Sequence, residues 1–264
     1  MTIISYQKKL IFVKPRKVAG TTIEIFLSKY CKGENDIITR ILEENLRTKL
    51  GYSGSKNYLS SNHKKFNFRL FYDFFLSFIK VIPGIKKLFT VNYPPNFKIW
   101  NGPFWIENFK FKEHEFIKDI KKKIDSKFFD EAFKITVVRN PYETFISQFF
   151  WQKHRGFISK ETKFYEYTKN NCEFFFNQQK NIIFLNNDLP YNFIIKYENL
   201  IEDLLKLAKQ IEINHSDIKG QLLKIQTKTN ITKKNKFEIL DNKSKKIIEK
   251  NARVFFEKFG YKKI

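Results

Sequence analysis

The residues best suited to bind an anion lie near the N-terminus, in the segment KPRKVAGTTIE at positions 14–24. The segment follows an apolar run, Leu10–Val13, which predicts a strand, and it leads into a helical pattern. A strand that ends in a small, cationic turn before a helix presents backbone amides and a lysine, here Lys17, to a bound anion. Thr21 and Glu24 have the spacing of a capping box at the helix start. An ordinary helix start has the same pattern, so the segment alone leaves both interpretations open.

A second junction, KITVVRNPYETFISQFF, combines an arginine with a hydroxyl. Arg139 ends an apolar run, Asn140 is a preferred N-cap residue, and Pro141 suits the first helical position. Ser147 lies two turns into the predicted helix, and helical side chains lean toward the N-terminus, which brings its hydroxyl toward Arg139. An arginine fork with a hydroxyl makes a second phosphate site. The alternative is that Arg139 pairs with a local carboxylate such as Glu143.

Neither junction has the signature of a metal site. In a Walker A loop the lysine follows a glycine and directly precedes Ser/Thr, whereas here Lys17 comes before Ala19 and Gly20. The two cysteines, Cys31 and Cys172, belong to no CxxC pair and to no His/Cys cluster with metal-ligand spacing. We therefore expect no metal, and a reducing compartment.

Strand-to-helix junctions recur along the chain and define the expected fold. The predicted strands are Leu10–Val13, Ile135–Val138, Ile182–Leu185 and Phe193–Tyr197. Three helix starts combine an N-cap residue with a glutamate three positions later, namely Thr21 with Glu24, Asn140 with Glu143 and Asn199 with Glu202. Short apolar strands that alternate with helices predict an α/β fold with a mostly parallel sheet flanked by helices. Ligands of such sheets bind at the carboxyl ends of the strands, where Lys17 and Arg139 are expected.

The length suits one core, so we expect a single domain over residues 1–264. The stretch 52–103 is rich in Phe and Asn, contains four prolines and predicts an insertion or lid-like subregion. Within it, Leu70–Phe89 mixes aromatic residues with lysines, which suits a lid, peripheral contact with an anionic membrane, or packing on the core; we favour core packing. The C-terminal run Lys243–Tyr261 predicts a helix that stops at Gly260.

The formal charge of +23 favours anionic partners, but 43 of the 50 basic residues are lysine. We attribute most of this charge to a solvated surface and expect no nucleic-acid partner, with a nucleic-acid-binding module as the alternative. No secretory signal opens the chain, and charges and prolines interrupt its most apolar window. We therefore expect a cytoplasmic protein, with peripheral membrane contact as an option.

Several of these segments, in this order, resemble one family. LIFVKPRKVAGTTIEIFL resembles the 5′-phosphosulfate loop of the sulfotransferases that use 3′-phosphoadenosine 5′-phosphosulfate (PAPS), and FKITVVRNPYETFISQFFW resembles their 3′-phosphate motif. HEFIKDIKKKIDSKFFDEAFK is similar to the segment before that motif in carbohydrate-type members, and the likeness extends to FIIKYENLIEDL and FFEKFGY. The resemblance covers about two-thirds of the chain. It departs at Val18 and Ala19, where the family often has Thr and Gly.

The resemblance implies a P-loop NTPase-like sulfotransferase sandwich, with PAPS as co-substrate and no metal. The implied nucleotide-binding residues are Arg16, Lys17, Ala19, Gly20, Thr21, Thr22, Arg139 and Ser147, and the implied catalytic residues are Lys17 and His114. The acceptor would be a hydroxyl of a carbohydrate, a glycolipid or a small metabolite.

Of the four histidines, His114 alone lies in the segment that resembles the base-bearing region of the family. An unperturbed pKa near 6.5 suits a histidine to accept a hydroxyl proton at neutral pH. A surface histidine at a helix start is the alternative, with Glu113 or Glu115 as reserve bases. A P-loop kinase is a further alternative for the whole chain, although it requires a Mg²⁺-holding carboxylate after a strand.

Overall fold

The computed structural model describes residues 2–39, 41, 43–57, 111–112, 114–214, 218–225 and 236–264. The strands are β1 Thr2–Ser5, β2 Leu10–Val13, β3 Ile37–Ile38, β4 Phe133–Val138 and β5 Phe193–Lys196. The α-helices are α1 Gly20–Ser28, α2 Glu44–Lys49, α5 Ile117–Lys123, α6 Ser126–Glu131, α7 Pro141–His154, α8 Phe164–Ile183, α9 Leu200–Gln210, α10 Ile218–Lys224, α11 Asn242–Asn251 and α12 Arg253–Phe259. Two 3₁₀ turns cover Tyr197–Asn199 and Lys236–Ile239.

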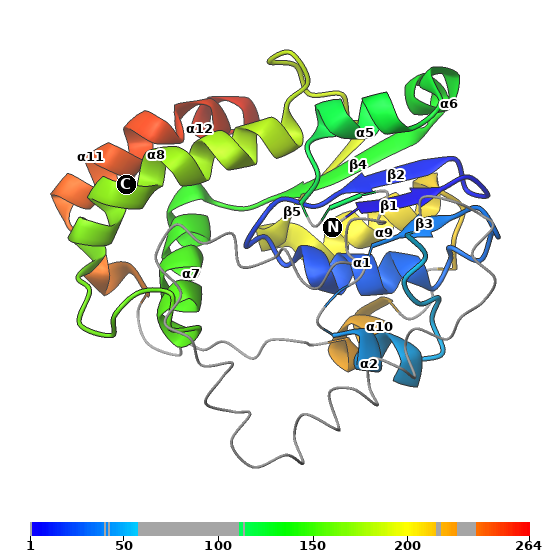
Figure 1. Ribbon diagram of the computed structural model, residues 1–264, viewed down its shortest axis with the longest axis horizontal. Coiled ribbons are helices and arrows are strands. Elements are labelled where there is room, and N and C mark those ends of the chain that lie inside the picture. Colours follow the sequence, from blue (N-terminus) through cyan, green and yellow to red (C-terminus); the bar gives the residue numbers. More distant parts are fainter. Residues whose placement is uncertain are drawn as a thin grey trace, which may run out of the picture. The chain divides into compact units, whose positions relative to one another are not determined.

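The described part of the chain is an α/β fold around one five-stranded open sheet, in the order β3-β1-β2-β4-β5 (Figure 1). The sheet is mixed: β2, β4 and β5 pair in parallel, whereas β1 pairs antiparallel with both β2 and β3. The predicted mostly parallel sheet is therefore wrong at one side. The cause is a tight turn at residues 6–9, where the Lys9 amide donates to the Tyr6 carbonyl and β1 and β2 become a hairpin.

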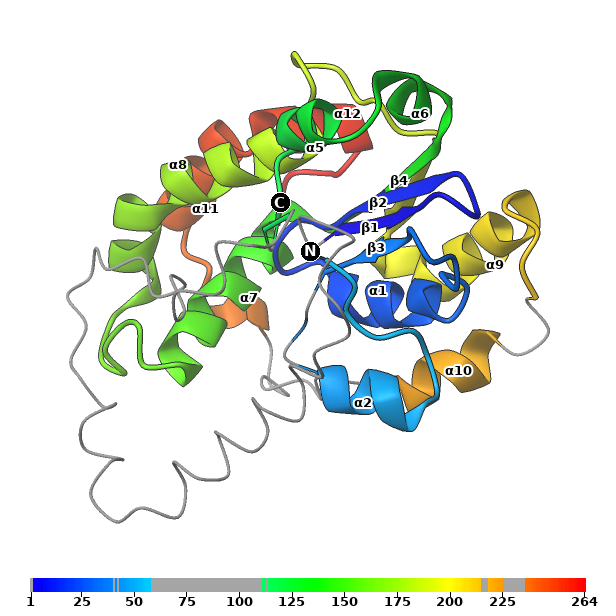
Figure 2. The ribbon, with the colours of Figure 1, turned by 45° about the vertical axis from the view of Figure 1, so that its right-hand side comes forward.

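Both faces of the sheet are buried, as the apolar strands predict. Along β2, Ile11 and Val13 join one cluster of buried side chains, and Leu10 and Phe12 join the other. Helices α5, α8, α11 and α12 lie over the first face, and α1 and α9 cover the second (Figure 1). Helix α10 packs on α1, and α2 lies near α10 in both ribbon views (Figures 1 and 2).

Two predicted elements differ from the structure. The strand predicted at Ile182–Leu185 is wrong, because the buried stripe of α8 continues through Ile183 and keeps this stretch helical. The C-terminal helix is divided at Ala252 into α11 and α12, and Gly260 ends α12 in the left-handed conformation (φ 66°), as predicted. The predicted parallel strands β2, β4 and β5 are confirmed within one or two residues.

The insertion predicted at 52–103 lies mostly outside the described residues, and so does Leu70–Phe89. Its first residues belong to the main body, because Lys56 exchanges two backbone hydrogen bonds with Ile38. The Asn57 carboxamide then bonds the backbone of Phe111 through both its oxygen and its nitrogen (3.0 and 2.8 Å). This pair joins the two ends of the described chain on either side of residues 58–110.

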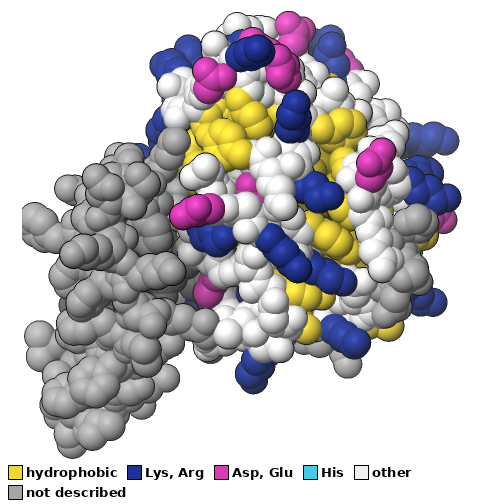
Figure 3. Space-filling model, turned by 90° about the vertical axis from the view of Figure 1, so that its right-hand side faces the viewer, with side chains coloured by type: hydrophobic (Ala, Val, Ile, Leu, Met, Phe, Trp, Pro, Cys, Tyr) yellow, Lys and Arg dark blue, Asp and Glu magenta, His cyan; other side chains and the backbone are white. Residues whose placement is uncertain are grey.

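Figure 3 shows one face of the molecule, on which Lys and Arg side chains are scattered among hydrophobic and uncharged groups. No described helix is both long and apolar enough to cross a lipid bilayer.

Candidate functional site

The loop between β2 and α1 has the backbone conformation of an anion-binding turn. Lys17 and Ala19 both adopt the left-handed conformation, with φ of 65° and 58°. Where left-handed residues alternate with right-handed ones, successive N–H groups point toward the same side of the loop. They then form a concave site that binds an anion. Among the described residues, no acceptor meets the amides of Gly20 or Thr21, while the Thr22 amide donates to the Ala19 carbonyl (3.0 Å). The Thr22 amide is therefore not available to a ligand, and the Thr22 hydroxyl is half-buried at the helix start.

Two contacts from distant segments hold this loop in place. The Gln179 carboxamide, on α8, accepts from the Arg16 amide and donates to the Arg16 carbonyl, both at 2.8 Å. The Thr136 hydroxyl, on β4, donates to the Val13 carbonyl at 3.0 Å. Gln179 is buried, so its two bonds are shielded from water. No local sequence pattern points to Gln179, because it lies 163 positions from Arg16.

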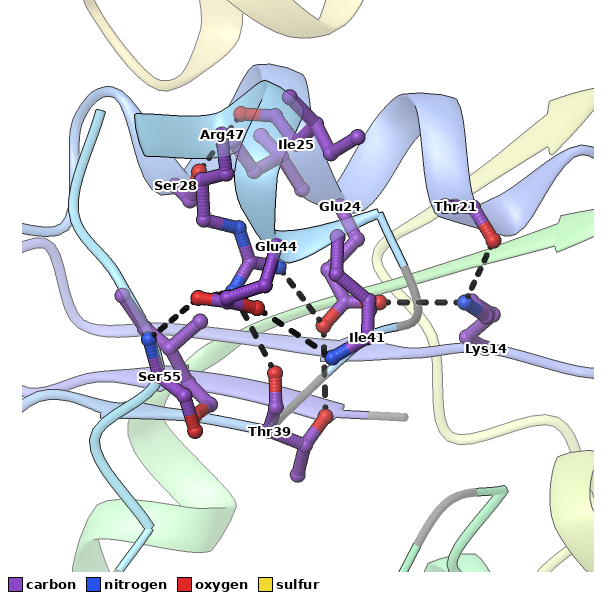
Figure 4. Close-up of polar contacts among 12 residues, drawn as sticks. Lys14, Thr21, Glu24, Ile25, Ser28, Thr39, Ile41, Glu44, Arg47 and Ser55 are labelled. Carbon is purple, nitrogen blue, oxygen red and sulfur yellow. Dashed lines mark hydrogen bonds and ion pairs between the residues drawn. The ribbon is translucent and has the colours of Figure 1, made fainter. Parts of the chain in front are cut away.

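Below the loop lies a buried charge network (Figure 4). Lys14 Nζ bonds the Thr21 hydroxyl at 3.0 Å and the Glu24 carboxylate at 3.1 Å, and Glu24 also accepts from Arg47 at 3.2 Å. These four side chains are buried, and Arg47 and Glu24 are 0 % exposed. A buried carboxylate needs such partners to remain ionised. Glycine is required at position 20, since a Cβ there would meet the Lys14 side chain at 2.2 Å.

This network corrects the capping-box prediction for α1. Ala19 is the N-cap residue and makes no side-chain cap, while Thr21 and Glu24 lie inside the helix and turn toward Lys14. The Thr21 hydroxyl oxygen accepts from Lys14, so its proton can be donated to a ligand. Lys17 lies over the Trp151 ring, 5.0 Å from the centroid, which connects the loop to α7.

Arg139 stands at the carboxyl end of β4 and is engaged by protein groups. Its Nη2 and Nε bond the Glu143 carboxylate at 2.5 and 3.2 Å, and the guanidinium lies 4.1 Å from the centroid of the Tyr197 ring. The alternative pairing with Glu143 is thus confirmed. Ser147 is half-buried on α7, and its hydroxyl makes no hydrogen bond within the described part of the chain. The loop and the arginine are neighbours, because Pro15, Val18 and Arg139 line one small cavity.

The start of α7 carries a further carboxylate. The Asn140 carboxamide accepts from the Tyr142 amide (3.0 Å), which confirms the predicted N-cap. The Asn140 amide itself donates to Glu198 (2.7 Å), whose other oxygen accepts from the Tyr261 hydroxyl (3.0 Å). At the third predicted junction, Asn199 makes no side-chain cap. Negative groups of the protein therefore surround both Arg139 and the N-terminus of α7.

His114 lies against the loop, as a base for this site requires. Its ring Nδ1 is 3.0 Å from the Lys14 carbonyl, and its backbone is left-handed, with φ of 56°. Burial lowers the pKa of His114 well below 6.5, and the positive charges of Lys14 and Arg16 act in the same direction. Since a carbonyl only accepts, Nδ1 carries the proton of the neutral ring and the lone pair is on Nε2.

The reserve bases are less suited to the role. Glu115 is buried and accepts from the Lys112 amide (2.6 Å) and from Lys123 Nζ (3.1 Å), which occupies its carboxylate. Glu113 lies outside the described residues. Within the described ranges, no group of three or more His, Cys, Asp or Glu side chains is placed to hold a metal ion.

Comparison with protein-family models, with curated proteins and with solved structures found no match for this chain. Functional inference therefore rests on the site itself.

Proposed function

We propose that the chain is a sulfotransferase that moves the sulfuryl group of PAPS to a hydroxyl of a carbohydrate or glycolipid. One observation carries the proposal: the loop at 17–21 combines a curled, amide-presenting backbone with a lysine, and His114 is held on the same loop. The loop follows a parallel strand at the carboxyl edge of the sheet, where α/β folds bind ligands. This strand–loop–helix order is also the basis for proposing a P-loop-like fold.

In this proposal the loop binds the 5′-phosphate and the sulfonate. Ala19 to Thr21 supply amides, Lys17 supplies charge, and the Thr21 and Thr22 hydroxyls donate hydrogen bonds. Arg16 adds a second cation beside the loop. These donors are fixed before the substrate arrives, because Gln179 and Lys14 hold the backbone and the helix start. Preorganised donors of this kind stabilise charge that develops during transfer.

Arg139 and Ser147 would bind the 3′-phosphate. For this the phosphate must take the place of the Glu143 carboxylate on Arg139, while the stack on Tyr197 keeps the guanidinium plane in position. A dianionic phosphate is a stronger partner for the arginine fork than one half-exposed carboxylate. Glu143 then acts as a stand-in that orients Arg139 when no nucleotide is bound.

The chemistry needs one proton transfer. The acceptor hydroxyl gives its proton to His114 Nε2, and its oxygen forms a bond to sulfur as the bond between sulfur and the 5′-phosphate oxygen breaks. The leaving group is adenosine 3′,5′-bisphosphate, whose new charge is stabilised by Lys17 and the loop amides. The lowered pKa keeps His114 neutral, and therefore able to accept the proton, at neutral pH.

The activity is tested by incubating the protein with PAPS labelled in its sulfuryl group and a mixture of neutral glycans and glycolipids. We expect label to reach the glycan fraction with the wild-type protein and with His154→Ala, whose histidine is exposed on the last turn of α7. A parallel reaction with γ-labelled ATP tests the kinase alternative. Transfer from ATP, or no transfer from PAPS to any hydroxyl compound of the mixture, would overturn the proposal.

A further inference from the structure

A second pocket, separate from the charge network, lies between α7 and α8 beside the loop. Its cavity volume is about 60 Å³, and it opens to solvent. Its polar lining comes from Arg16, Gln148, Gln152, Asn171 and Gln178, with Phe174 among its aromatic groups. Most of these side chains are uncharged carboxamides, which is unusual on a chain with a formal charge of +23.

The spacing of these residues explains how they converge. Gln148 and Gln152 are four positions apart on α7, and Asn171, Phe174 and Gln178 follow one face of α8. Within the described part of the chain, the carboxamides of Gln152 and Gln178 have no hydrogen-bond partner. Each can therefore offer both donors and an acceptor to a ligand.

The remaining lining groups define the ligand further. Asn171 Nδ2 donates to the Tyr167 carbonyl (3.0 Å), and the side-chain oxygen of Asn171 remains available as an acceptor. Phe174 is 69 % exposed and offers an apolar ring at the pocket. Hydroxyl groups match carboxamides because both donate and accept, and a sugar ring also has apolar C–H faces that pack on an aromatic ring. Among the described residues that line the pocket, Arg16 is the one with a charged side chain, so a polyanion has little to pair with here.

We propose that this pocket binds a neutral saccharide. The pocket shares Arg16 with the loop, and the bonds from Gln179 of α8 fix the Arg16 backbone. A saccharide held between α7 and α8 would thus lie beside the sulfonate-binding loop. Its role as the sulfuryl acceptor rests on the proposed function, whereas its binding to the carboxamides does not.

Binding is tested without nucleotide, on an array of immobilised neutral glycans, acidic glycans and adenosine, with the intact chain. We expect neutral glycans to be retained, and the double variant Gln152→Ala/Gln178→Ala and the variant Phe174→Ala each to lose at least tenfold in retention. The matched control is Asn177→Ala, which removes an exposed carboxamide of α8 that does not line the pocket. Thermal unfolding of each variant checks that the fold is kept.

Three results would overturn the inference: no retention of any neutral glycan, a preference for acidic glycans or adenosine, or retention unchanged in both pocket variants. Failure here is distinguishable from failure of the proposed function, because nucleotide binding is measured separately and does not use Gln152, Gln178 or Phe174. Glycan retention without PAPS turnover would leave the pocket assigned and remove its role as an acceptor site.

Discussion

At the scale of single residues, the site depends on backbone conformations that ordinary residues avoid. Lys17, Ala19 and His114 all have positive φ, and a non-glycine residue in this region costs roughly 1–2 kcal/mol. The sequence indicated which residues could bind an anion, but its capping-box pattern predicted Thr21 as the N-cap residue and left an ordinary helix start open as the alternative. The left-handed turn was missed because lysine and alanine do not signal a positive φ, and the nearest glycine, Gly20, lies one position beyond Ala19.

The left-handed conformation of Ala19 predicts that Ala19→Gly stabilises the fold. Glycine adopts φ of 58° without the Cβ clash, so we expect the free energy of unfolding to rise by about 1 kcal/mol in urea denaturation. The control is Ala208→Gly, inside α9, which should lower it by a similar or larger amount. Destabilisation by Ala19→Gly would mean that the loop is not strained there.

The contact between His114 and the loop predicts a selective loss in His114→Ala. Turnover should fall by a hundredfold or more, as loss of a general base causes, while affinity for the bisphosphate changes little. Because burial lowers the pKa of His114, the acid limb of the wild-type rate profile should lie below pH 6.5. His154→Ala is the control. Near-normal turnover would remove His114 from the mechanism, and a loss of nucleotide binding would make it a positioning residue.

At the scale of elements, buried charge connects β2, α1 and α2. Lys14 follows β2, Glu24 lies in α1, and Arg47 in α2 brings its guanidinium to the same carboxylate. Periodicity could not reveal this, because it records which face of a helix is apolar and not which polar side chains are paired. The partners are 10 and 23 positions away, a separation at which residue patterns carry no pairing information.

The network predicts that Glu24→Gln destabilises the protein strongly. The change leaves Lys14 and Arg47 buried without their shared carboxylate, and such a loss costs on the order of 3–5 kcal/mol. In the control Glu257→Gln, the removed carboxylate is 58 % exposed and pairs with the exposed Arg253 of α12, so we expect a loss of about 1 kcal/mol or less. Urea denaturation of the two variants measures the difference. Equal effects would show that burial at Glu24 adds nothing to the stability.

At the scale of the whole molecule, the parallel half of the sheet could be predicted and the antiparallel half could not. Strands β2, β4 and β5 are apolar runs followed by helices, which is a local signal. Strand β1 is followed by a turn and a second strand rather than by a helix, and β3 has two residues, so neither gives this signal. The pairing of β1 with β2 depends on the turn at residues 6–9. The same holds for the residues of the site. Lys17 and Arg139 could be predicted because they lie at strand–helix junctions, whereas Gln179 and Trp151 could not, because they reach the loop from helices distant in the sequence.

We propose that the loop and Arg139 together bind a nucleotide with phosphates at both the 3′ and 5′ positions. Calorimetry with adenosine 3′,5′-bisphosphate and with ADP, in about 0.15 M salt to screen the lysine-rich surface, tests it directly. We expect the bisphosphate to bind 10- to 100-fold more tightly, because charge-assisted bonds to Arg139 contribute roughly 1.5–3 kcal/mol.

Arg139→Ala should abolish most of this preference with the fold intact, whereas the control Arg155→Ala, exposed at the C-cap of α7, should retain it. Equal affinity of the wild-type protein for ADP and the bisphosphate would contradict the proposed 3′-phosphate site at Arg139.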